Sequence, residues 1–201
     1  MNRVAVFLPL LALAACSQNS PDEAEPATLH EIMTAEIDEP ADALWDVSNA
    51  AIGDEAGIDP ALMDDERWEQ IAVLAERVAA GAQRIAALDP IVVTRDGVEV
   101  ADADIEGGHS AAQVQAAVDA NPELLRELAE SLGTHVTELA AAARAHDAAR
   151  AGPLIDQLDG VCETCHLNFW YPEQKDLVEQ FQNEGLVDPD HPALGPSESG
   201  E

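Results

Sequence analysis

Prolines that follow capping residues divide the middle of this chain into stretches long enough for helices. Asp59-Pro60 and Asn121-Pro122 each join a helix-capping residue to the residue favoured at the first helical position. Asp89-Pro90, Gly152-Pro153 and Pro172 mark breaks or ends. Between these points, apolar residues recur at the three- and four-residue spacing of a buried helix face. The sequence therefore predicts an all-α fold.

Four amphipathic helices are expected within residues 28–182, and Pro40 kinks or splits the first of them. The predicted helices are Leu29–Ile52, a stretch from Asp59-Pro60 to Asp89-Pro90, a stretch from Pro122 to about Arg150, and a stretch from Gly152-Pro153 to Pro172.

Residues 89–121 begin with short β-like runs in place of the helical spacing of apolar residues found on either side. They are predicted to be an insertion between the second and third helices. Two β-like runs flank Arg95-Asp96-Gly97, which fits a small hairpin. Two strands alone are marginal in water, so a loop draped over the helices is an equally good interpretation. Ser110–Ala120 is expected to be a short helix that Ser110 caps.

Cys162, Cys165 and His166 form a C-x-x-C-H in the fourth predicted helix, which is the attachment pattern for a c-type haem. Two thiols add across the vinyl groups of haem as thioethers, and the following histidine can bind the iron. Residues i, i+3 and i+4 share one helix face, so these side chains can meet one flat ligand. The pattern predicts one covalent haem c, with His166 as an axial ligand and Phe169 and Trp170 packed nearby.

A redox-active C-x-x-C, half of a zinc site and a chance match are the alternatives. A thioredoxin-like pair would sit in a strand-to-helix context, and no β-α-β alternation surrounds this motif. A structural zinc site needs two more ligands, and the chain has no second C-x-x-C and no H-x3-H.

Met1–Ala15 is predicted to be a signal peptide. Arg3 supplies a positive charge, and Val4–Ala14 is an apolar run too short to span a membrane. The run ends in Leu13-Ala14-Ala15-Cys16, which resembles the lipobox of bacterial lipoproteins. Ordinary secretion with a chance cysteine is the alternative.

The lipobox resemblance implies cleavage before Cys16 and acylation of its thiol, and Ser17 resembles the signal for sorting to the outer membrane. We therefore expect a periplasmic protein that contacts the membrane only through its lipid anchor. Residues 16–27 are expected to form a flexible tether, and residues 183–201 a disordered tail.

Four amphipathic helices with the attachment motif in the last one resemble the class II cytochromes c, the cytochrome c-prime family. The resemblance covers roughly Leu29 to Tyr171, and no methionine follows His166. It implies a four-helix bundle of up-down-up-down topology over residues 28–182, interrupted by the 89–121 insertion. The family commonly has a basic residue where this chain has Trp170, so its gas discrimination does not transfer directly.

In that family the first helix covers the distal side of the haem. Some members leave the iron five-coordinate and bind nitric oxide or carbon monoxide, and others place a methionine on the iron and transfer electrons. Met33 lies on the apolar stripe of the first helix, where such a sixth ligand would originate. A core-filling role for Met33 is the alternative, and His30 is a rival ligand.

The resulting hypothesis is a single-haem cytochrome that transfers electrons and is not an enzyme. The first alternative is a five-coordinate protein that binds or senses diatomic gases, with Leu29, Ile32 and Met33 as steric gatekeepers. A peroxidase would need a distal acid–base group, for which His30 is the only nearby candidate. His109, in the insertion, fits a solvated loop residue better than a haem ligand.

The chain has 40 acidic and 9 basic residues, which gives a formal net charge of -31. This charge disfavours nucleic acid and anionic lipid as partners and favours a basic redox partner. Members of the resembled family often form dimers through their first two helices. A homodimer is therefore an alternative here, although the charge opposes it.

Overall fold

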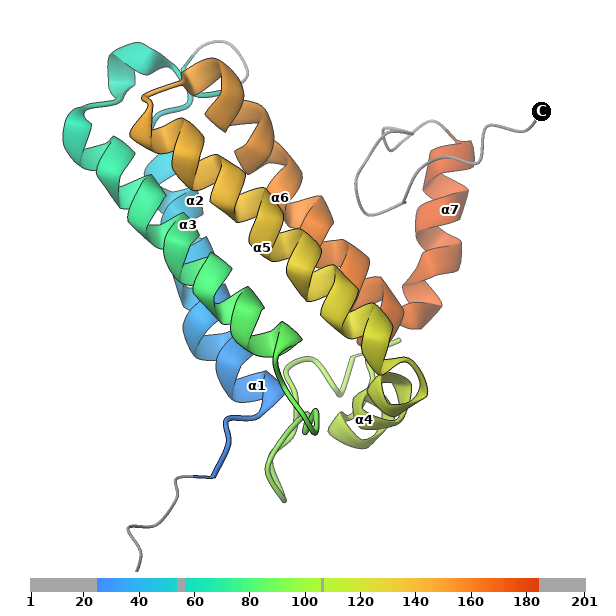
Figure 1. Cartoon of the computed structure of the whole chain (residues 1–201). Helices are drawn as coiled ribbons and strands as arrows, with labels where there is room; N and C mark the ends of the chain where they lie inside the picture. The colour runs from blue at the N-terminus through green and yellow to red at the C-terminus, as the bar shows by residue number, and fades with distance from the viewer. Residues whose placement is uncertain (1–24, 54–56, 106, 185–201) are drawn as a thin grey trace, which may run out of the picture.

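The computed structural model describes residues 25–53, 57–105 and 107–184, which are mostly helical (Figure 1). These residues contain no strand, and one isolated antiparallel bridge joins Ile52 and Ile58. The predicted all-α class is therefore confirmed for this part of the chain. The predicted signal peptide, Cys16, most of the tether and nearly all of the tail lie outside the described residues.

The first helical segment is continuous but changes its hydrogen bonding near its start. It consists of α1 (Leu29–Ile32), the π-helical segment η1 (Met33–Asp38) and α2 (Glu39–Asn49). The backbone N–H of Glu39 donates to the carbonyl of Thr34, five residues back. Pro40 has no N–H to donate, so the regular ladder is already broken there. The predicted irregularity therefore occurs, but in the residues before Pro40 and as a π-helix rather than as a split.

The second long helix, α3 (Asp65–Ala86), begins later than the sequence suggested. Asp59 does accept a hydrogen bond from the Ala61 N–H at 2.8 Å, but it caps only the short 3-10 turn η2 (Pro60–Leu62). The chain is extended at Met63, and Asp64 then caps α3. Two capping signals stand close together here, and the later one starts the long helix.

The boundary between α5 (Pro122–Arg144) and α6 (Ala148–Phe169) also differs from the prediction. His146 adopts a φ of 51°, which turns the chain, and the Asp147 side chain accepts from the Arg150 N–H to cap α6. Pro153 lies inside α6 rather than before it. Pro153 costs α6 one backbone hydrogen bond in its second turn, and the Asp147 cap before it determines where the helix begins.

The insertion forms a loop and then α4 (Ala111–Ala120), which Ser110 caps as predicted. The hairpin alternative is wrong, because residues 91–98 contain a turn but no strand pairing. Their carbonyls bind another element instead: the N–H groups of Leu29 and His30 donate to Val92 and Val93 at 2.8 and 2.9 Å. The draped-loop interpretation is therefore confirmed.

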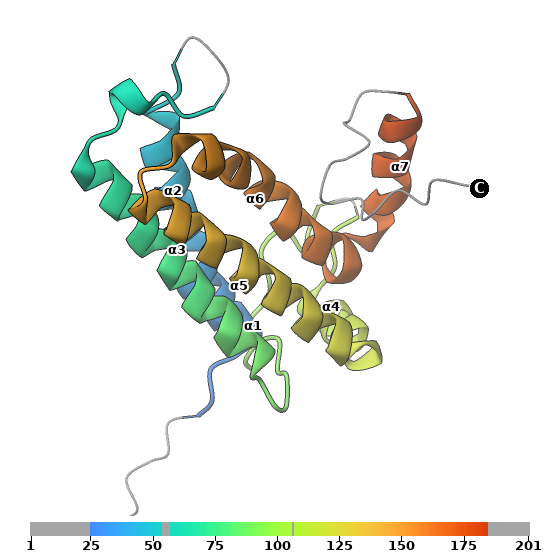
Figure 2. The ribbon, with the colours of Figure 1, turned by 45° about the horizontal axis from the view of Figure 1, so that its top comes forward.

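The long helices lie side by side, with α2 against α3, α3 against α5, and α5 against α6 (Figures 1 and 2). The last helix, α7 (Lys175–Asn183), follows the turn η3 (Pro172–Gln174) and stands away from the others in both views. The core is aliphatic, and its largest fully buried side chains include Ile32, Leu44, Ile71, Leu139 and Leu158.

The π-helical segment approaches α3 closely at Gly81. A Cβ atom at Gly81 would lie 2.8 Å from Ile37 Cδ1 and 2.9 Å from the Glu36 carbonyl oxygen. Arg84, one turn further along α3, forms an ion pair with Glu36. The position of η1 therefore depends on the absence of a side chain at Gly81.

Gly81→Ala should lower the free energy of unfolding by about 1–3 kcal/mol, because a methyl group would overlap the backbone and side chains of η1. The matched control is Gly133→Ala in α5, where a Cβ would lie 3.6 Å from Ala82 Cβ. That change should be neutral or stabilising by about 0.5–1 kcal/mol. Urea unfolding followed by circular dichroism measures both. Equal stability of the two variants would contradict the close approach.

Candidate functional site

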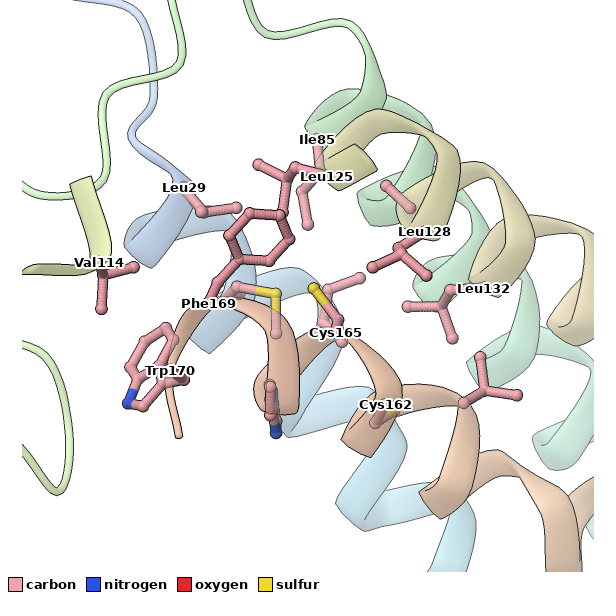
Figure 3. A pocket seen from close by; sticks show the side chains of 15 residues that line it. Leu29, Ile85, Val114, Leu125, Leu128, Leu132, Cys162, Cys165, Phe169 and Trp170 are labelled. Atoms are coloured by element: carbon pink, nitrogen blue, oxygen red, sulfur yellow. The ribbon is translucent and has the colours of Figure 1, made fainter. Parts of the chain in front are cut away.

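The three motif side chains line one cavity, and α6 brings them there. Cys162 and Cys165 lie near the end of α6 and line the cavity (Figure 3). His166, the next residue, lines the same cavity. Leu29, Met33 and Ile37 line the cavity from the first segment, and α3, α4 and α5 contribute Ile85, Val114, Leu125, Leu128 and Leu132. The local sequence prediction that Cys162, Cys165 and His166 share a face is thus confirmed.

The cavity is apolar and opens to solvent. The empty space between its lining side chains, counted together with the solvent in its mouth, is about 620 Å³. Apart from His166 and the thiols, the side chains named above are aliphatic. In Figure 3, Val114 and Trp170 stand at one end and Cys162 and Leu132 towards the other. Two thiols and one imidazole on an apolar surface are the donor groups that covalent attachment of a metal-bearing ring requires.

Both thiols of the motif are protonated. Among the residues that the structure describes, Cys162 and Cys165 form no disulfide. Burial raises the pKa of the Cys162 thiol to about 12, and the carboxylates of Asp159 and Asp38 act in the same direction. Burial also raises the pKa of Cys165 to about 12. A redox-active C-x-x-C instead lowers a thiol pKa, so this environment does not favour the redox-pair alternative.

His166 is held as a neutral imidazole. Burial lowers its pKa, against the opposing effect of Asp159 and Asp38. Its ring lies 6.1 Å from the Trp170 ring and 6.4 Å from the Tyr171 ring, centroid to centroid. The neutral form is the one that binds a metal, and the two aromatic rings restrict its orientation.

A compact metal site gains no support from the described residues. No three His, Cys, Asp or Glu side chains among them gather closely enough to hold an ion. The two thiols and the imidazole of the motif therefore lie along one helix face and do not converge on a single point.

Met33 and His30, the two predicted rivals for the distal position, take different places. Met33 lines the apolar cavity and also a second, more open hollow shared with Cys162 and His166. His30 is not among the residues that line either space, and its buried Nδ1 atom has no hydrogen-bond partner within the described part of the chain. Of the two, only Met33 is brought to the same cavity as the motif.

His109, His146 and two further tryptophans lie at separate places in the structure. His109 is mostly buried, and its Nε2 atom lies 3.1 Å from Glu173 Oε1, so it is not the solvated loop residue expected. Trp68 is buried and stacks on His146 with ring centroids 5.7 Å apart, apart from the cavity. Trp45 lines the open hollow.

Sequence reasoning missed the contribution of the insertion. Val114 of α4 lines the cavity, and the insertion binds the chain that follows the motif: the Trp170 indole N–H donates to the Ala101 carbonyl at 3.1 Å. No periodicity or motif links these positions to α6, so the sequence held no signal for them.

Comparison with models of known protein families, with curated proteins and with solved structures gave no match. None of the helices in the described residues combines the length and apolar character that a membrane span needs.

The cavity thiols should react slowly in the haem-free chain. We expect Cys162 and Cys165, in a Cys16→Ser background, to react with a maleimide at pH 8 about a hundredfold or more slowly than after unfolding in guanidinium. The reason is that burial keeps the nucleophilic thiolate rare. Mass spectrometry of timed samples measures the two rates. Similar rates in the folded and unfolded chain would contradict the burial of this face.

Proposed function

We propose that this chain is a single-haem c-type cytochrome that transfers electrons in the periplasm. The observation that carries the proposal is that Cys162, Cys165 and His166 line one apolar cavity together with Met33. Covalent attachment needs two thiols and an imidazole on one surface, and electron transfer favours an iron whose axial positions are both filled. This arrangement provides candidates for all four groups.

The proposed architecture is an up-down-up-down four-helix bundle like that of the class II cytochromes c. The segment α1–η1–α2, α3, α5 and α6 would be its four members, with the 89–121 insertion between the second and third. The neighbouring pairs α2 and α3, α3 and α5, and α5 and α6 support it. So does a cavity that lies between the first segment, α5 and α6.

The residues of this chain would hold the cofactor and exclude water. When bound, haem supplies an iron that cycles between Fe(III) and Fe(II). Cys162 and Cys165 would hold the ring: each S–H would add across one vinyl double bond, forming a C–S bond while the thiol hydrogen goes to the other vinyl carbon. Neutral His166 offers a nitrogen lone pair, and Met33 offers a thioether sulfur. Aliphatic walls keep solvent away and so influence the potential.

Gas binding is the second candidate function. Of the expected gatekeepers, Leu29 and Met33 line the cavity and Ile32 does not. Ile37, one turn after Met33, also lines it. If Met33 only fills space, these side chains leave an apolar distal pocket suited to nitric oxide or carbon monoxide. A peroxidase is disfavoured because His30, its candidate acid–base group, does not line the cavity. The protein is therefore proposed to be a cytochrome and not an enzyme.

The proposed partner is a basic redox protein. Asp38, Asp159 and Glu163 line the open hollow beside His166, and the net charge is -31. Such a surface attracts positive protein faces and repels nucleic acid. The charge also opposes the association of two copies, and a homodimer is the alternative to a monomer. Cys16 is proposed to carry the lipid that anchors the protein, with the outer membrane favoured.

The purified full-length protein should carry one covalent haem c, with a low-spin spectrum in both oxidation states that carbon monoxide does not change. Absorption spectra with and without carbon monoxide test this, and a haem stain on a denaturing gel reports attachment. A Cys162→Ala, Cys165→Ala variant is the negative control. Absence of haem from the parent would defeat the proposal, and a high-spin spectrum that responds to carbon monoxide would favour gas binding.

Met33→Ala should convert the reduced protein to a high-spin form that binds carbon monoxide, because it removes the proposed sixth ligand. Met63→Ala is the matched control, since Met63 lies before α3 and does not line the cavity. An unchanged low-spin spectrum in Met33→Ala would show that another group fills the sixth position.

Cys16→Ser should move the protein from the membrane fraction to the soluble periplasmic fraction, because it removes the proposed acylation site. Fractionation followed by haem staining measures the distribution. Retention in the membrane fraction would contradict the lipid anchor and leave the haem proposal intact.

A further inference from the structure

The insertion connects the two walls of the cavity that carry Met33 and His166. The helix α6 packs against α5, and the first segment packs against α3, so these two walls face each other across the cavity instead of packing closely. The insertion contacts both. It therefore offers a direct mechanical link between the proposed distal and proximal sides.

On the distal side, the insertion binds the first turn of α1. The N–H groups of Leu29 and His30 donate to Val92 and Val93, which satisfies donors that a helix start leaves without partners. Arg95 donates to both carboxylate oxygens of Glu31, from Nε at 2.6 Å and from a terminal nitrogen at 3.0 Å. A bidentate pair of this kind fixes orientation as well as distance.

Glu31 has a second role in the same turn. Its Oε2 atom accepts from the Thr28 N–H at 2.9 Å, and its own N–H donates to Thr28 Oγ1, forming a capping box. Met33 follows two residues later, at the start of the π-helical segment. Arg95 therefore holds the turn from which Met33 projects.

On the proximal side, the insertion binds the residues that follow the motif. The Trp170 indole N–H donates to the Ala101 carbonyl, and the Tyr171 hydroxyl donates to Asp102 Oδ2, each at 3.1 Å. The His109 N–H donates to the Trp170 carbonyl, also at 3.1 Å. The rings of Trp170 and Tyr171 are the ones that lie against His166.

We infer that the insertion is a clasp that sets the separation of Met33 from His166, with Arg95 as a positioning residue that decides whether Met33 can serve as the sixth ligand. This inference rests on the proposed haem function. The π-helical segment suits this control of the Met33 position, because π-helical turns within α-helices occur frequently at functional sites. Loosening the clasp frees the turn that carries Met33 while leaving the Cys162 and Cys165 attachment unchanged.

The test uses the full-length haem-loaded protein with Arg95→Gln. Haem content should equal that of the parent, while a high-spin component and carbon monoxide binding appear. Hydrogen exchange in residues 29–38 should become about three- to tenfold faster, the range expected for losing a partly exposed bidentate pair. Arg95→Lys, which keeps the charge but not the fork, should restore part of the parent behaviour.

Arg144→Gln is the matched control. Arg95 pairs with Glu25 as well as with Glu31, each at 2.6 Å. Arg144 likewise bridges two carboxylates, Glu76 at 2.8 Å and Glu69 at 2.9 Å, but it joins α5 to α3 outside the cavity lining. It should leave the spectrum and the exchange of residues 29–38 unchanged. Parent-like spectra and exchange in Arg95→Gln, or equal effects of both arginine changes, would overturn the clasp.

The outcome also separates the two proposals. Absence of haem from the parent defeats the haem function, and the difference in hydrogen exchange between the two arginine variants then still tests the clasp in the haem-free chain. If the parent is already high-spin, the clasp predicts that Arg95→Gln changes carbon monoxide affinity and Arg144→Gln does not. Equal affinities in all three proteins would overturn it.

Discussion

The burial of one face of α6 controls both the chemistry and the packing of this molecule. A protein interior normally fills such a face with interlocking aliphatic side chains. Here two thiols and an imidazole occupy it, and the facing helices leave an apolar cavity instead. The same burial keeps the thiols protonated and His166 neutral. One structural fact thus accounts for the shape of the site and for the protonation states of its polar groups.

Features set by neighbouring residues were predictable from the sequence. The shared face of Cys162, Cys165 and His166 follows from helix geometry alone, and the Ser110 cap follows from hydrogen bonding within one turn. Boundaries failed where two local signals competed. Asp59-Pro60 and Asp64 both mark helix starts, and the second determined where α3 begins. Choosing between such signals depends on packing that a local pattern does not contain.

Features set by distant residues were not predictable. Glycine inside a helix ordinarily destabilises it. At Gly81, however, the lack of a side chain is what lets η1 lie against α3. The runs around Arg95 resemble strands because their alternation suits a pleated surface. Their backbone groups bind α1 instead, because a helix start presents N–H donors that need acceptors. Val114 reaches the cavity through the same long-range arrangement.

Because acidic residues greatly outnumber basic ones, the few arginines have a large effect on how the helices align. Three of them lie at junctions between elements: Arg84 binds Glu36 of η1, Arg95 binds Glu31 of α1, and Arg144 joins α5 to α3. An exposed ion pair ordinarily contributes little. In a chain of charge -31, however, removing one of these cations also leaves carboxylates facing each other without a counter-charge. The mutual repulsion of the carboxylates therefore makes the alignment of the helices depend on a small number of cations. Two of these, Arg84 and Arg95, hold the segment that carries Met33.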